Sequence, residues 1–148
     1  LQGFVHDEAS AFFGGLAGNA GLFSTARDVA RVYQMLLNGG EIDGQRYLSK
    51  ETCQLFTTEI SKISRRGLGF DKPDADDPKK GNCAPAAPAE VYGHTGFTGT
   101  CAWVDPMNEL VYVFLINRIY PDVTNRKLNQ LNIRERLQGA IYDAMKKK

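Results

Sequence analysis

Apolar residues recur at helical spacing in the first third of the chain. Five of them would share one face of a helix: Val29, Val32, Tyr33, Leu36 and Leu37. Thr25 and Asp28 have the spacing of a capping box before this stretch, and Gly39-Gly40 supply a stop after it. The pattern predicts a helix over 26–38 that buries this apolar face.

Two further helices and a turn are indicated by the same kind of signal. Asp43-Gly44 lies between short β-compatible flanks, which predicts a small hairpin or turn within 41–48. Ser49 can cap a short helix that reaches about Thr57. Near the end of the chain, Asn132 and Glu135 have capping-box spacing before a final helix. Its apolar stripe comprises Ile133, Leu137, Ala140, Ile141 and Ala144.

The pattern changes to that of strands after residue 67. Leu68 and Phe70 form a short strand-like piece, and residues 72–90, with four of the six prolines, form a loop. Two runs, 97–104 and 110–117, are rich in β-branched and aromatic residues and predict an antiparallel hairpin. Because the second run is apolar on both faces, we expect it in the middle of a covered sheet. The predicted fold class is α+β, an antiparallel sheet with flanking helices.

Composition narrows the class of protein further. A chain of 148 residues with 43% hydrophobic and 24% charged residues is typical of one packed domain, 1–148. The formal net charge of +1 gives no field that would recruit nucleic acid, and no apolar run approaches the ~20 residues of a membrane span. The three cysteines lack Cys-x-x-Cys spacing, so they indicate neither a disulfide framework nor a zinc knuckle. We expect no nucleic acid, no membrane span and no cofactor.

Candidate chemistry centres on the only two histidines, His6 and His94. A metal site made of His6, Asp7 and His94 lacks the His-x-x-x-His spacing, so we expect no metal and interpret His6 as a loop residue hydrogen-bonded to its neighbours. His94 stands in a glycine-rich strand entry, 93–99, where a backbone N–H can meet an oxyanion while a side chain reaches the same pocket. A surface histidine at a tight strand entry is the alternative.

Several segments together resemble a known family. They are His94-Thr95-Gly96, the hairpin residues 103–106 and 110–118, and the earlier segments 5–7 and 15–25. These segments resemble the C-terminal half of beta-lactamase-related serine hydrolases, which include class C beta-lactamases, penicillin-binding D-Ala-D-Ala carboxypeptidases and esterases. The resemblance covers nearly the whole chain except the loop 72–90, and it implies the C-terminal portion of a beta-lactamase/transpeptidase-like fold.

The resemblance also implies roles for individual residues. His94, Thr95 and Gly96 match the family's third signature, Lys-Thr-Gly or His-x-Gly, at the strand beside the nucleophile. By the same resemblance, the backbone N–H of Phe97 is the second donor of the oxyanion hole.

Substrate binding is implied for two positions farther along. Asp122 and Arg126 lie where the family's carboxylate-binding segment ends the last strand. Asp122 stands where the family often has Asn, and Arg126 is offset by one residue.

Two family motifs are not found in these 148 residues. The first is Ser-x-x-Lys, which supplies the nucleophile and the base, and the second is Tyr-x-Asn or Ser-x-Asn, which relays the proton. The segment nearest to the first motif is Ser24-Thr25-Ala26-Arg27, but arginine cannot act as the base. We therefore expect one incomplete domain, truncated before the nucleophile helix and inactive alone. Its parent would be an acyl-transferring hydrolase of β-lactams, D-Ala-D-Ala peptides or esters, in the periplasm or cell envelope by resemblance.

Other hypotheses remain open at this point. The chain could be a non-catalytic module of a larger protein whose glycine-rich loops and residues 72–90 bind a partner, and a metal-dependent hydrolase ranks third. A strand missing from the sheet would expose the edge at 110–117, so we also expect self-association through this strand.

Overall fold

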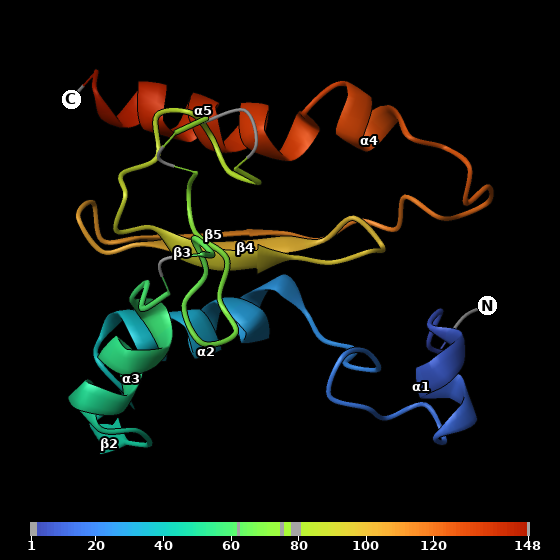
Figure 1. Cartoon of the computed structure of the whole chain (residues 1–148), viewed down its shortest axis with the longest axis horizontal. Coiled ribbons are helices and arrows are strands. Elements are labelled where there is room, and N and C mark those ends of the chain that lie inside the picture. Colours follow the sequence, from blue (N-terminus) through green and yellow to red (C-terminus); the bar gives the residue numbers. More distant parts are fainter. Residues whose placement is uncertain (1–2, 62, 75, 78–80, 148) are drawn as a thin grey trace.

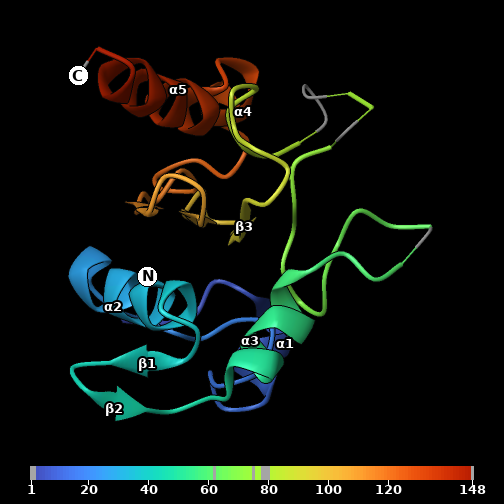
Figure 2. The same ribbon diagram turned by 90° about the vertical axis from the view of Figure 1, so that its left-hand side faces the viewer.

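The computed structural model describes residues 3–61, 63–74, 76–77 and 81–147. A central antiparallel sheet lies between helices on both faces (Figures 1 and 2). Its strands are β3 (Tyr92–Thr95), β4 (Cys101–Asp105) and β5 (Leu110–Phe114), in the order β3-β4-β5. Helix α5 (Ile133–Met145) covers one face, and α2 (Ala26–Leu37) covers the other. The predicted α+β class is confirmed.

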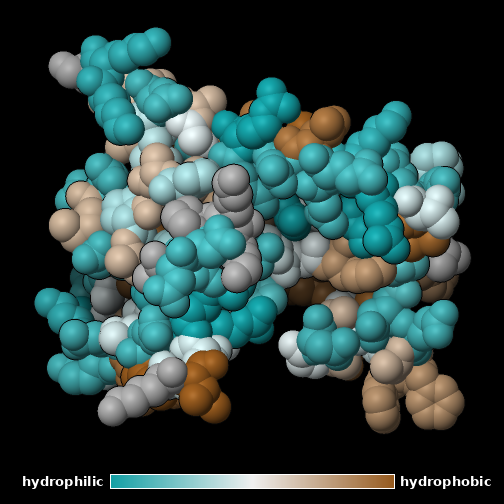
Figure 3. All heavy atoms as spheres, turned by 45° about the horizontal axis from the view of Figure 1, so that its top comes forward, coloured by the Kyte–Doolittle hydropathy of each residue, from teal (hydrophilic) through white to brown (hydrophobic). Residues whose placement is uncertain are grey.

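Smaller elements surround these three layers. They are α1 (Glu8–Phe12), β1 (Glu41–Ile42), β2 (Gln45–Arg46), α3 (Lys50–Thr57) and α4 (Lys127–Gln130). The outer face around α4 and α5 is largely hydrophilic (Figure 3). The predicted apolar stripe of α5 is nevertheless not buried as a whole: Leu137, Ala140 and Ala144 are exposed, and the buried residues of the helix are Arg134, Gln138 and Tyr142. No helix in the described part of the chain is long and apolar enough to span a membrane.

Helix α2 begins and ends where the sequence predicts. The Thr25 hydroxyl accepts the N–H of Asp28 at 3.2 Å, and Gly39 and Gly40 follow the helix with φ of +67° and +94°. A Cβ at Gly40 would lie 2.2 Å from the carbonyl oxygen of Leu48, so this position requires glycine. The expected burial is met only in part: Val29, Tyr33, Leu36 and Leu37 are half-buried, Val32 is 55% exposed, and no residue of α2 is fully buried.

The β3–β4 connection differs from the prediction. The strand expected to begin at Phe97 begins at Cys101, because residues 96–100 form a tight turn and not extended chain. His94 therefore lies within β3 and does not open the following strand. Gly99, with φ of +106°, bends the chain where a Cβ would lie 2.7 Å from Leu128. The predicted strand piece at 68–70 is also wrong, since only an isolated bridge joins Asp71 to Gly93.

The central position in the sheet belongs to β4 and not to β5. All five residues of β4 are buried, whereas β5 is mostly half-buried and pairs only with β4 within the described chain. The expectation of a central strand at 110–117 is therefore wrong for this sheet. The apolar character of β5 on both faces arises because α2 and α5 cover it from the two sides.

The start of α5 is also unlike the predicted capping box. Asn132 has φ of +48° and makes no side-chain capping hydrogen bond. A capping side chain normally sits on extended backbone, and the left-handed conformation of Asn132 does not provide it.

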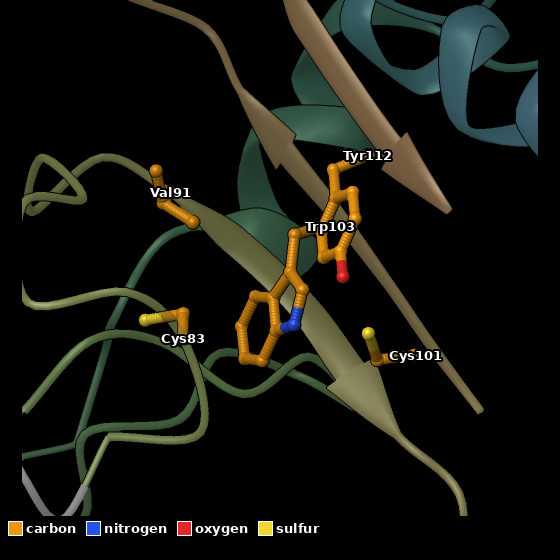
Figure 4. Packing of buried hydrophobic residues seen from close by; sticks show 5 residues of the cluster. All are labelled: Cys83, Val91, Cys101, Trp103 and Tyr112. Carbon is orange, nitrogen blue, oxygen red and sulfur yellow. The ribbon is translucent and has the colours of Figure 1, made fainter. Parts of the chain in front are cut away.

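The core lies between the sheet and α5. Figure 4 shows its five residues: Cys83, Val91, Cys101, Trp103 and Tyr112. Burial raises the pKa of the Cys83 thiol to about 12 and that of Cys101 to about 11, so both thiols stay protonated at neutral pH.

The loop 72–90 is anchored to this core, although its residues 75 and 78–80 lie outside the described part. Cys83 packs in the core cluster, and the side-chain oxygen of Gln138 on α5 accepts the N–H of Ala84 at 2.8 Å. Close by, the Tyr142 hydroxyl donates to Asp105 at 2.8 Å and joins α5 to the end of β4. The described parts of the loop are thus an ordered element of the core.

We predict unequal costs for the same substitution at two valines. Val91→Ala should lower the free energy of unfolding by about 2 kcal/mol, because Val91 is fully buried and the change leaves a cavity. Val32→Ala on α2, where the side chain is 55% exposed, should change it by less than about 0.5 kcal/mol. Urea unfolding of both variants is the measurement, and equal costs would contradict the described core.

We also predict self-association through the free edge of β5. Unpaired backbone groups and apolar side chains at an edge favour pairing with a second copy. Light scattering with size-exclusion chromatography across a dilution series should show concentration-dependent dimers, and Leu115→Lys should suppress them. Leu115 directly follows β5 and is 40% exposed. Leu55→Lys on α3 is the control, and a wild-type chain that stays monomeric throughout would refute the prediction.

Candidate functional site

The β3–β4 turn places the signature residues at one end of the sheet. His94 pairs with Ala102 and Thr95 with Cys101, so their side chains point to opposite faces. Thr95 shares the α5 face with the buried Trp103, and His94 lies on the α2 face. The chain then turns sharply, since Gly96 N–H donates to the Thr100 carbonyl at 2.8 Å.

His94 is held in one tautomer by its own strand. Its Nδ1 lies 2.7 Å from the carbonyl oxygen of Thr95. Because a carbonyl oxygen can only accept, Nδ1 carries the proton, and in the neutral ring Nε2 is left as the acceptor. The side chain is exposed, so Nε2 is available to an incoming group.

The N–H of Phe97 has no acceptor within the described chain. Two other N–H groups of the turn do have acceptors: Gly96 donates to the Thr100 carbonyl, and Gly99 donates to the Gly96 carbonyl at 2.9 Å. Phe97 therefore offers a backbone donor at the position that the family resemblance implies.

Phe97 is packed by two residues from other parts of the chain. The His6 ring stacks on it with centroids 5.6 Å apart and an interplanar angle of 11°. The Arg118 guanidinium lies 4.6 Å from its centroid, and Arg118 Nε donates to the Phe97 carbonyl at 2.8 Å. His6 does lie in a loop, as expected, but its described contact is this stacking on Phe97 and not a hydrogen bond to its neighbours.

A hollow of ≈ 650 Å³ opens beside the turn. Four of the site residues predicted from the sequence line this hollow: Thr95, Gly96, Phe97 and Arg126. His94 and Asp122 are not among its lining residues.

Asp122 makes a local turn near this hollow. Its carboxylate accepts the Thr124 hydroxyl at 2.7 Å and the Thr124 N–H at 2.8 Å. These hydrogen bonds lower the pKa of Asp122 below its ordinary value. Asp122 thereby fixes Thr124, which does line the hollow.

The sequence analysis did not single out several other residues at this hollow. They are Asn82, Arg118, Val123, Thr124, Asn129 and Arg134. One signal could have indicated Arg134, because a basic residue in the first turn of a helix opposes the helix dipole and needs another reason to be there.

A buried carboxylate positions one of these residues. Asp71 is 1% exposed; it accepts the Asn82 amide at 2.9 Å and forms an ion pair with Arg65 Nε at 2.9 Å. Burial alone would raise the pKa of Asp71, but the hydrogen bonds from Asn82 and Arg65 outweigh it, and the pKa is lowered. The adjacent Lys72 Nζ donates to three backbone carbonyls and ties the same segment down.

Within the described residues, no three His, Cys, Asp or Glu side chains gather closely enough to hold a metal ion. The residues around the hollow instead offer a backbone N–H donor and several guanidinium groups, while the imidazole acceptor of His94 lies on the other face of the sheet. The N–H and guanidinium groups can stabilise negative charge on a bound ligand.

Comparison with known proteins gives a consistent result. The family model described as Beta-lactamase matches residues 2–135. A protein of Escherichia coli K12 named "Putative D-alanyl-D-alanine carboxypeptidase" is 35% identical over 130 residues, 87% of this chain and 30% of that protein. A protein of the same name from Salmonella typhi is 36% identical over 130 residues, with the same coverage. The chain thus spans about 30% of the length of these curated relatives.

A solved structure is also similar. It is described as a novel penicillin-binding protein homolog from Caulobacter crescentus, with a TM-score of 0.48 and 26% sequence identity. The similarity covers 60% of this chain and 24% of that one.

We predict that acid destabilises the chain through Asp71. Because its folded pKa is below the unfolded value of about 3.9, its stabilisation is complete above about pH 5. It is lost as the pH falls below about 4 toward the folded pKa. Asp71→Asn should cost roughly 2–4 kcal/mol at pH 7, and the difference from wild type should shrink below pH 4.

Urea unfolding between pH 3 and pH 7 measures this effect. Asp43→Asn is the matched control, because Asp43 forms only an exposed ion pair with Arg31. A pH dependence equal in wild type and Asp71→Asn would contradict the assignment.

Proposed function

The chain belongs to the Beta-lactamase family, and from this premise we propose that it forms one wall of the active site of a serine hydrolase. The reaction is acyl transfer from a D-Ala-D-Ala peptide, a β-lactam or an ester. The D-alanyl-D-alanine carboxypeptidase name of the relatives supports a peptidoglycan-like peptide as the substrate. Family membership does not favour the alternative of a non-catalytic partner-binding module.

The unpaired N–H of Phe97 is the observation that carries this proposal. In acyl transfer, a serine Oγ attacks the substrate carbonyl carbon and negative charge develops on the carbonyl oxygen. Backbone N–H groups held rigidly at that oxygen stabilise the transition state. Phe97 is held in this way by the β3–β4 turn, the His6 ring and Arg118.

The neighbouring residues take complementary roles in this proposal. His94, with Nε2 as acceptor, tunes the proton network. Thr95, Gly96 and Arg126 line the hollow and bind substrate, and Asp122 contributes by fixing Thr124.

The nucleophile and its base come from outside these 148 residues, since neither Ser-x-x-Lys nor the relay motif occurs within them. In this proposal, residues 1–148 are part of a single domain and become active only with that complement. The loop 72–90 is a variable part of the domain whose described residues support Asn82 at the hollow.

We predict that the 148-residue chain alone forms no penicilloyl adduct and does not hydrolyse a chromogenic cephalosporin above background. A longer polypeptide, translated from the upstream coding sequence through Lys148, should be acylated at a serine in a Ser-x-x-Lys motif. Phe97→Pro removes the N–H and should slow acylation by roughly 10²–10³-fold. Phe97→Ala keeps the N–H and should retain most of the rate.

Mass spectrometry and stopped-flow acylation with a fluorescent penicillin give these readouts, and circular dichroism checks the fold of both variants. A stoichiometric serine adduct on the short chain would overturn the external nucleophile. Upstream sequence without Ser-x-x-Lys, or equal rates for the two Phe97 variants, would overturn the proposed function.

A further inference from the structure

A small folded unit near the start of the chain meets the β3–β4 turn through one aromatic ring. This unit, residues 6–21, contains the helix α1 and the glycine-rich segment 14–21, to which the proposed reaction assigns no role. Figure 1 shows α1 at the end of the molecule where β3 turns into β4. His6 lies just before the cap of α1 and stacks on Phe97. The unit is therefore placed to act on Phe97.

A network of hydrogen bonds holds the residue next to His6. The Asp7 carboxylate caps α1 by accepting the Ser10 N–H at 2.7 Å, and it accepts the Asn19 side-chain amide at 3.3 Å. The Ser10 hydroxyl donates to the Asn19 side-chain oxygen at 3.2 Å, and Ser10 is fully buried. The hydrogen bonds from Ser10 and Asn19 lower the pKa of Asp7 below its ordinary value. We call His6, Asp7, Ser10 and Asn19 the brace.

The glycine-rich segment brings Asn19 back to Asp7. The Gly15 N–H donates to the Ser10 carbonyl at 2.7 Å, which ties the start of this segment to α1. Gly21 has φ of +116°, and a Cβ there would lie 2.2 Å from the Gly15 carbonyl oxygen. The segment thus closes on itself so tightly that the position requires glycine. This closure gives the glycine-rich segment a structural task in the brace.

The peptide group that carries the Phe97 N–H needs support from outside the turn. Its carbonyl belongs to Gly96 and accepts the Gly99 N–H at 2.9 Å, which restrains one side of the peptide plane. A single hydrogen bond allows the plane to tilt, and glycines at 96 and 99 add backbone freedom. The Phe97 side chain can restrain the other side, but its ring is 66% exposed. The ring's position therefore depends on the contacts with His6 and Arg118.

The two contacts restrain Phe97 in different ways. Arg118 bonds its carbonyl and lies against its ring, whereas His6 stacks on the ring with nearly parallel planes. A stacked ring opposes rotation of the Phe97 side chain, and an imidazole can do this while its polar edge stays in water. The contact that the structure gives His6 thus restrains Phe97 through a ring face and needs no proton transfer.

We propose that the brace fixes the oxyanion-hole donor: His6 is a positioning residue for the Phe97 N–H, and Asn19 acts through His6 by holding Asp7. This inference rests on the proposed function, since it assigns the residues that keep the donor of that site in place. Because Asn19 acts only through His6, the effects of removing the two side chains are not additive.

Nuclear magnetic resonance of the 148-residue chain tests the brace itself. Nuclear Overhauser contacts should join the rings of His6 and Phe97, and ¹⁵N relaxation should give the Phe97 amide an order parameter near ~0.85, as in rigid backbone. His6→Ala should lower this order parameter below about 0.6. His6→Phe should retain it, because phenylalanine also stacks. Asn19→Ala should lower it part of the way.

Acylation of the longer polypeptide by the fluorescent penicillin tests the consequence for the reaction. His6→Ala should slow the acylation step about tenfold, less than loss of the donor itself, while the Kd of the non-covalent complex changes less than about twofold. Asn19→Ala should slow it about threefold in the wild-type background and cause no further loss in the His6→Ala background. His6→Phe should react within about twofold of wild type.

Phe12→Ala is the matched control, because Phe12 lies on α1, is 87% exposed and packs edge-on against Phe13. It should leave the order parameter and the acylation rate at their wild-type values. Circular dichroism checks the fold, and the exposed Asn19→Ala decides the matter if His6→Ala does not fold. A wild-type order parameter in folded His6→Ala, slow acylation of His6→Phe, wild-type values in Asn19→Ala, or additive effects of His6→Ala and Asn19→Ala would each overturn the proposal.

The outcome is separable from that of the proposed function, because the relaxation measurement needs no nucleophile. An ordered Phe97 amide that depends on His6, with no serine acylation in the longer polypeptide, would overturn the proposed function and leave the brace standing. Acylation that is unchanged by His6→Ala would overturn this inference alone.

Discussion

The burial of β4 on both faces is the constraint on which the rest of the structure depends. All five of its residues are buried, so one layer must cover each side of the sheet. Helix α5 and the loop 72–90 cover the face of Trp103, and α2 covers the face of Ala102 and Val104. Because β4 is fixed between two layers, the turn that enters it from β3 is fixed as well, and the candidate site is built on that turn.

Buried polar groups connect the layers in defined positions. Gln138 holds the loop to α5, Tyr142 holds α5 to Asp105 at the end of β4, and Asp71 holds Asn82 beside the hollow. A buried polar group is stable only when its hydrogen bonds are made, so each of these contacts allows little freedom. The same contacts hold the residues around the hollow in fixed positions. Preorganised stabilisation of charge requires donors that are fixed in this way.

In the proposed function, this chain supplies substrate binding and charge stabilisation, and the nucleophile comes from another segment. Its most reactive groups in principle, the thiols of Cys83 and Cys101, are buried and have raised pKa values. The groups that face the turn are a backbone N–H, an imidazole and guanidiniums, which hold and polarise a ligand without forming a bond to it. This division fits a family in which a serine from another segment carries out the covalent step.

The sequence by itself determined the elements whose signals are local. Contacts within a few residues determine three of them: α2 with its Thr25 cap and its Gly39-Gly40 stop, the Asp43-Gly44 turn, and α3 with its Ser49 cap. The motif His94-Thr95-Gly96 likewise pointed to the site. Only the tertiary structure decided that β5 is an edge strand, that His6 stacks on Phe97, and that Arg126 and Arg134 line the same hollow. These features depend on residues up to about 90 positions apart meeting in space, and hydrophobic periodicity carries no information about which distant faces meet.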